Sequence, residues 1–125
     1  MSDNILKLEL NRIKGLSEMS PNSALKSLDE SITSGVESIG IWMLKASIHF
    51  QLDQHTLAAT SFQKVLKRKP KNKLASIGLF HSLCGSGNTD GAFDEMNRYF
   101  EELGVDHQSE TPNDYRSIVK EINEK

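Results

Sequence analysis

Residues 41–70, IWMLKASIHFQLDQHTLAATSFQKVLKRKP, contain two helical patterns on either side of a short polar break. Apolar residues recur at steps of three and four, so each pattern places its apolar side chains on one face of a helix. The break, LDQH at 52–55, is short enough to return the second helix along the first. The stretch therefore predicts a pair of antiparallel helices. The first stripe is Trp42, Ala46 and Phe50, and the second is Ala58, Phe62, Val65 and Leu66.

The second helix of this pair belongs to a repeat. Alanine recurs at Ala24, Ala58 and Ala92, a spacing of 34 residues both times, and a large apolar residue stands four positions after each. A fixed period of this length is typical of stacked helix pairs, in which each unit buries its apolar face against the next. The expected repeats span 5–38, 39–72 and 73–106 within a single domain, 1–125, and their internal turns span 17–22, 52–55 and 85–90.

The middle unit resembles a tetratricopeptide repeat. That family's pattern is W-x2-L-G-x2-Y, followed by A-x3-F and finally P. Lys45 and His49 depart from it, because they stand in place of the leucine and the tyrosine. The resemblance covers about 5–106 and implies an all-α fold, an α-solenoid of about three antiparallel helix pairs. The residues at matching spacings are Trp42, Ala46, Ala58, Phe62 and Pro70.

The C-terminal stretch TPNDYRSIVKEINEK, 111–125, predicts one more helix. Thr111 has the residue type of a helix cap, Pro112 suits the first helical position, and Asp114 completes a capping-box spacing. A final helix with one apolar stripe is what a stacked array needs to cover its end. We therefore expect a capping helix at 112–124.

Composition and charge narrow the classes of function. The 125 residues carry a net charge of −2, which argues against a dedicated nucleic-acid binder. The longest wholly apolar run has four residues, and the N-terminus lacks the order of a secretory signal, so we expect no membrane segment and a cytoplasmic location. The lone cysteine, Cys84, cannot form an internal disulfide, which suits a reducing compartment.

The stretch LCGSGNTDGAF, 83–93, has the residues of a catalytic or phosphate-binding loop but not their spacing. Its glycines do not fit G-x-G-x-x-G, no strand precedes them, and no lysine followed by serine or threonine is present. In the register of the repeats it joins two helices. Gly85 and Gly87 would end the first of them, and Asn88 or Thr89 would cap the second.

Cys84 and His81 are the candidates for chemistry. They stand one helical turn apart, but no oxyanion donor or third orienting residue accompanies them, as a nucleophile would need. His49 would add at most one more ligand to a zinc site. We therefore expect no enzyme activity, no metal and no cofactor, and a redox or metal protein built on Cys84 and His81 stays as an alternative.

By the same resemblance, the first helices of the pairs line a concave groove that receives a segment of another protein. Phe50 and Ile77 would be its apolar anchors, unless they are ordinary core residues. The lysine, asparagine and arginine clamp with which such repeats bind acidic chaperone tails is absent from the corresponding positions, such as Leu44 and Gly78. The expected partner-binding residues are Ile13, Leu16, Met43, Ser47, Phe50, Gln51, Ile77, His81 and Cys84.

Two charged stretches offer other surfaces. Residues 64–73 hold six lysines and arginines, and residues 90–114 hold eight acids against one arginine. Most such runs are solvated faces, but these two could also contact an anionic partner or join copies of the chain head to tail. No aromatic residue lies among the basic ones, which disfavours RNA and DNA.

The sequence thus predicts a non-catalytic module that binds a peptide or amphipathic helix of a partner protein in an apolar groove, as an adaptor, chaperone or inhibitor. Self-association is the alternative within the same class.

Overall fold

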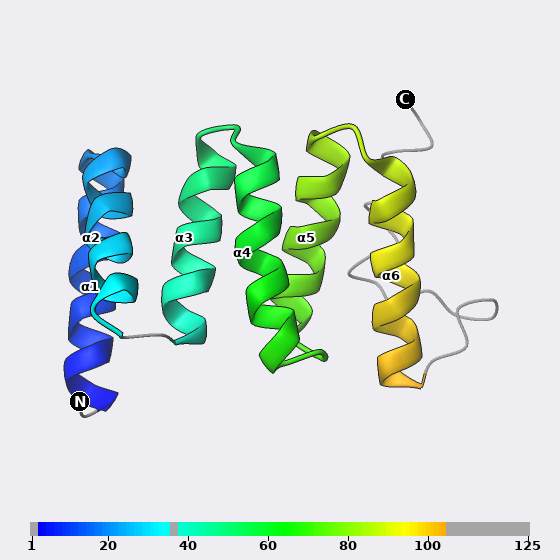
Figure 1. The fold of residues 1–125 in the computed structure, drawn as a ribbon, viewed down its shortest axis with the longest axis horizontal. Coiled ribbons are helices and arrows are strands. Elements are labelled where there is room, and N and C mark those ends of the chain that lie inside the picture. The colour runs from blue at the N-terminus through cyan, green and yellow to red at the C-terminus, as the bar shows by residue number, and fades with distance from the viewer. Residues whose placement is uncertain (1–2, 36–37, 105–125) are drawn as a thin grey trace.

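The chain is described by a computed structural model over residues 3–35 and 38–104, with side chains from residue 7 onward. These residues form helices and no strand, and the helices follow one another along the longest axis of the molecule (Figure 1). No described helix has the length and apolar character needed to cross a membrane. The expected capping helix at 112–124 lies outside the described residues. The helices are α1 (Asp3–Met19), α2 (Pro21–Thr33), α3 (Ile39–Gln51), α4 (His55–Arg68), α5 (Lys73–Gly85) and α6 (Thr89–Leu103).

Packing is sequential. The members of each pair, α1 and α2, α3 and α4, α5 and α6, contact each other, and α4 also packs against α5. The first pair joins the array through α3, which contacts both α1 and α2. Contacts between successive elements are the defining feature of a solenoid. The predicted all-α solenoid of three antiparallel helix pairs is therefore confirmed for the described residues.

The 34-residue period marks the core. Ala24, Ala58 and Ala92 are each 0% exposed. A methyl group is the smallest side chain that fills such a position, so the second helix of each pair can approach the first closely. Four residues later, Leu28 and Phe62 are buried as well, whereas Met96 is only partly buried.

Side-chain caps begin three of the helices. Ser38, Asn72 and Asn88 each accept a hydrogen bond from a backbone N–H three residues on, at the starts of α3, α5 and α6. This capping satisfies one of the N–H groups that a helix leaves unpaired at its N-terminus. The predicted turn at 85–90 is therefore present but shorter, since only residues 86–88 separate α5 from α6, and Asn88 caps α6.

One more expectation about turns needs correction. Gly85 ends α5, as predicted, and Gly87 in the turn that follows has a positive φ of +86°. The first turn, however, is shorter than 17–22, because α1 continues to Met19 and Pro21 already begins α2. Proline needs no hydrogen-bond partner for its nitrogen at a first helical position, so Ser20 alone can separate the two helices.

One of the two departures from the repeat pattern, Lys45, forms a polar contact between the first and second pairs, and the other, His49, is buried. The Lys45 ammonium lies 2.8 Å from an Asp29 carboxylate oxygen on α2 and 5.3 Å from the centre of the Trp42 ring. His49 is 7% exposed. Burial lowers the pKa of His49, Lys45 lowers it further, and Asp29 partly opposes the shift. Lys45 thus joins α3 to α2.

A buried carboxylate joins α5 to α6. Glu95 is 7% exposed and accepts hydrogen bonds from the Ser76 hydroxyl at 2.7 Å and from two nitrogens of Arg98 at 2.6 and 2.7 Å. The same guanidinium donates to the Pro70 carbonyl at 3.1 Å. The network thus connects α5, α6 and the turn between α4 and α5.

Candidate functional site

A hollow of about 260 Å³ lies between α3 and α5, and we call it the α3–α5 hollow. Four of its lining residues are among the nine predicted from the sequence: Ser47, Phe50, Gln51 and His81. The first helices of the second and third pairs therefore bring predicted residues together at one place. The full lining is Ser47, Phe50 and Gln51 from α3, Phe62 from α4, and Gly78 and His81 from α5.

The hollow exists because α3 and α5 both pack mainly on α4 rather than on each other. Phe62 of α4 fills the bottom of the space and is 5% exposed. Gly78 stands beside it on α5, and a Cβ built at Gly78 would overlap the Phe62 ring. A glycine at this position therefore lets the ring lie against the α5 backbone and keeps the space above it open.

Phe50 is held in place by two histidines. Its ring is 5.1 Å from that of His55 and 6.3 Å from that of His81, with interplanar angles of 77° and 71°. These edge-to-face arrangements are the ones that aromatic rings prefer. Phe50 is partly buried and packs against the core cluster of α3, α4 and α5, while another part of it lines the hollow. It is thus both a core residue and a lining residue.

The lining combines an apolar floor with an uncharged polar rim. Ser47 and Gln51 are exposed and offer a hydroxyl and an amide at the edge of the Phe50 and Phe62 rings. No Asp, Glu, Lys or Arg contributes to this lining. Chemically, such a site accepts an uncharged apolar group and can hydrogen-bond to a polar group next to it.

Ile13 was wrongly expected to face a groove. It is 1% exposed and lies in the core cluster with Ala24, Leu28, Ile41 and Ile48. The reason is that α1 contacts α3 directly. The space between α1 and α3 that would correspond to the α3–α5 hollow is therefore filled by Ile13. Leu16 packs partly buried against the same cluster.

The remaining predicted residues do not line the hollow. Met43 packs partly buried against the α3–α5 core cluster. Ile77 and Cys84 pack partly buried against the cluster of α5 and α6. Burial raises the pKa of the Cys84 thiol, which favours the neutral form, the weaker nucleophile. Within the described residues, no three His, Cys, Asp or Glu side chains are placed to hold a metal ion.

Phe62 and Gly78 were missed as lining residues. The apolar pattern of the sequence predicts Phe62 to be a core residue, and it is one. Gly78 entered the sequence analysis only as a position where a clamp residue is absent. A glycine in the middle of a helix lowers helix stability, so it usually marks a place where another group packs closely against the backbone. The position of Gly78 inside a predicted helix is the signal that could have identified this contact with Phe62.

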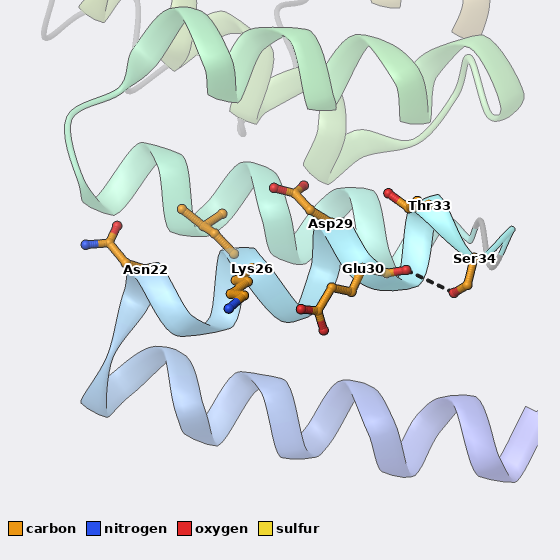
Figure 2. A pocket seen from close by; sticks show the side chains of 7 residues that line it. Asn22, Lys26, Asp29, Glu30, Thr33 and Ser34 are labelled. Carbon is orange, nitrogen blue, oxygen red and sulfur yellow. Dashed lines mark hydrogen bonds between the residues drawn. The ribbon is translucent and has the colours of Figure 1, made fainter.

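A larger hollow, about 580 Å³, lies along α2. Figure 2 shows its labelled side chains, all from α2 and the residue after it. It mixes opposite charges, and Asp29 is already paired with Lys45. A charged surface built from one helix offers less to a ligand than the α3–α5 hollow, to which three helices contribute. Its lining is Asn22, Leu25, Lys26, Asp29, Glu30, Thr33 and Ser34.

Comparisons of the chain with protein-family models, with curated proteins and with solved structures find no match.

Proposed function

We propose that this chain is a non-catalytic binding module that takes up an amphipathic helix or peptide of a partner protein along α3 and α5. The observation that carries the proposal is the α3–α5 hollow, with its aromatic floor and its uncharged polar rim. A volume of about 260 Å³ is below the range of about 300–1,000 Å³ that holds small-molecule ligands. It suits one anchoring side chain of a larger partner.

Residues on α5 extend the surface beyond the hollow. Leu74, Gly78 and His81 stand at i, i+4 and i+7, so they share one helix face. Leu74 is 67% exposed and large, and Gly78 and His81 line the hollow. A partner helix lying along this face would place one aliphatic side chain in the hollow and a second over Leu74, the spacing of helix-in-groove recognition.

The resemblance of the middle unit to tetratricopeptide repeats supports the same proposal, because that family binds protein segments along its first helices. In keeping with this resemblance, we propose a role as adaptor, chaperone or inhibitor. The lone cysteine, which cannot form an internal disulfide, favours the cytoplasm as its location. The rival, a redox or metal protein built on Cys84 and His81, predicts bound zinc or a loss of function in Cys84→Ser.

The test uses a phage library of random peptides about 15 residues long, near the length at which isolated helices become marginally stable. Peptides are selected on the wild-type chain and then measured on two tryptophan variants. Ser47→Trp fills the hollow from its exposed rim, and Thr60→Trp places the same side chain on an exposed position of α4 away from the lining.

We expect selected peptides with apolar residues at i, i+3 or i+4 and i+7. They should bind Ser47→Trp at least about tenfold more weakly, a difference of about 1.4 kcal/mol, and bind Thr60→Trp as they bind wild type. Equal binding to Ser47→Trp, or the absence of any selected peptide, would contradict the proposal. Circular dichroism of each variant verifies that the helices are retained.

A further inference from the structure

The turn between α4 and α5 concentrates positive charge. Its cations are all exposed: Lys67, Arg68, Lys69, Lys71 and Lys73. We call three of them, Lys67, Lys69 and Lys71, the basic turn. Elsewhere, Arg12, Lys45 and Arg98 are paired with Glu9, Asp29 and Glu95. In the described part of the chain, Lys67, Lys69 and Lys71 have no carboxylate within ion-pair distance.

The basic turn borders a hollow of about 520 Å³. Lys69 and Lys71 line it together with the apolar side chains of Ile39 and Pro70. Lys67 and Arg68 stand in the last turn of α4, where cations complement the helix dipole. That explanation does not extend to Lys69 and Lys71, which follow the helix.

The outer face of α6 concentrates negative charge. Asp90, Asp94 and Glu101 are exposed and are spaced by four and seven residues, so they form one ridge along the helix. Ala92 and Phe100, which face the core, lie on the other side of the same helix. No lysine or arginine of the described residues pairs with this acidic ridge.

The two surfaces are complementary and lie in the same half of the molecule. Figure 1 shows the α4–α5 turn, the start of α3 and the C-terminal end of α6 at one edge of the array. Arg98 and Glu102 of α6 reach this edge, at the Pro70 carbonyl and at the hollow. Among the described residues, no ion pair joins the acidic ridge to Lys67, Lys69 or Lys71 of the same chain.

We propose that the basic turn is an interface for a second copy of this chain, whose acidic ridge docks against it. The pairing is electrostatic, so it is strong at low salt and screened at high salt. A nucleic acid is a poorer occupant, because Glu102 lines the same hollow and the whole chain carries a net charge of −2. This interface does not involve the α3–α5 hollow.

The experiment measures the mass of the full chain by sedimentation equilibrium at about 10 mM and about 1 M salt, where the Debye lengths are about 30 and 3 Å. One variant reverses the basic turn, Lys69→Glu with Lys71→Glu. Another reverses the acidic ridge, Asp94→Lys with Glu101→Lys. The control, Lys7→Glu with Lys14→Glu, makes the same change in net charge as the first variant but on exposed positions of α1.

At low salt, we expect the mass of wild type and of the control to rise with concentration from 14.0 kDa toward twice that value or more, and to return to 14.0 kDa at high salt. Each reversed variant should stay at 14.0 kDa alone. An equal mixture of the two should associate again, because the ridge of each now complements the turn of the other.

The proposal is overturned if wild type stays monomeric at low salt, if the control loses association as completely as the reversed turn, or if the mixture does not associate. Loss of association in Ser47→Trp would overturn it too, since the second copy would then occupy the α3–α5 hollow. Tighter binding of an oligo(dT) probe than of a second copy would assign the basic turn to nucleic acid. Peptide binding in the hollow is measured separately, so each proposal can fail alone.

Discussion

Gly78 lies on α5 at the point where the Phe62 ring reaches it from α4. The ring occupies the place that a side chain would take, and the two residues together form one wall and the floor of the α3–α5 hollow. Any added atom at Gly78 must displace a ring that is 5% exposed in a packed core. The geometry of the candidate site therefore depends on the absence of a methyl group.

We expect Gly78→Ala to destabilise the protein. Overpacking a core costs about 1–3 kcal/mol, and the better helix propensity of alanine returns about 1 kcal/mol of it. The free energy of unfolding in urea should therefore fall by up to about 2 kcal/mol. The substitution Phe62→Leu should lower the free energy of unfolding less in the Gly78→Ala variant than in wild type. The smaller leucine side chain makes room for the added methyl group.

Gly15→Ala is the matched control. Gly15 lies inside α1, and a Cβ built there meets no atom within 4 Å. The same substitution should stabilise the chain by about 0.5–1 kcal/mol. If Gly78→Ala and Gly15→Ala stabilise the protein equally, the Phe62 ring does not pack closely against α5.

The sequence predicts which helix face carries the residues of this site, but it does not predict how deeply each of them is buried. Ser47, Phe50, Gln51 and His81 were predicted from the resemblance to tetratricopeptide repeats, which implies that one face of each first helix lines a groove. Ile13 was predicted in the same way and is nevertheless buried, because the direct contact of α1 with α3 depends on how the pairs are offset. That offset is set by packing between distant residues, which periodicity does not encode.

At the scale of the elements, the 34-residue period and the short turns determine the helices closely. The ends of α3, α4 and α5 follow from polar turns and from capping residues such as Asn72. The buried hydrogen bonds that join α5 to α6 could not be predicted from the period or from the turns. Glu95 belongs to a run that was interpreted as solvated charge, yet it is buried, because its partners Ser76 and Arg98 come together only in the fold.

Removing that carboxylate should loosen α6. Glu95→Ala eliminates the acceptor of three hydrogen bonds, from Ser76 and Arg98. The loss should lower the free energy of unfolding by about 1–3 kcal/mol, and amide exchange should accelerate first in α6. Glu95→Gln keeps an acceptor for Ser76 and should cost less.

Glu101→Ala serves as the comparison, because Glu101 is an exposed acid on the same helix. Its effect should stay within about 0.5 kcal/mol. Equal effects of Glu95→Ala and Glu101→Ala would mean that the buried network contributes nothing beyond surface charge.

At the scale of the whole molecule, the core is divided along the array. One cluster joins α1, α2 and α3, another joins α3, α4 and α5, and a third joins α5 and α6. In an array with contacts only between neighbours, stability is a sum of units and of the interfaces between them. A defect in one cluster should therefore open its own unit before the others.

Leu28→Ala tests this division. Leu28 is 0% exposed in the first cluster, and its truncation should cost about 2–5 kcal/mol there. Hydrogen exchange followed by mass spectrometry should then show faster exchange in α1, α2 and the facing side of α3, with α5 and α6 little changed. Leu79→Ala, in the central cluster, should instead accelerate exchange from α3 to α5. Uniform acceleration in Leu28→Ala, including α6, would mean that the chain unfolds as one cooperative unit. Local opening would leave the α3–α5 hollow intact in Leu28→Ala, so peptides selected on wild type should still bind this variant.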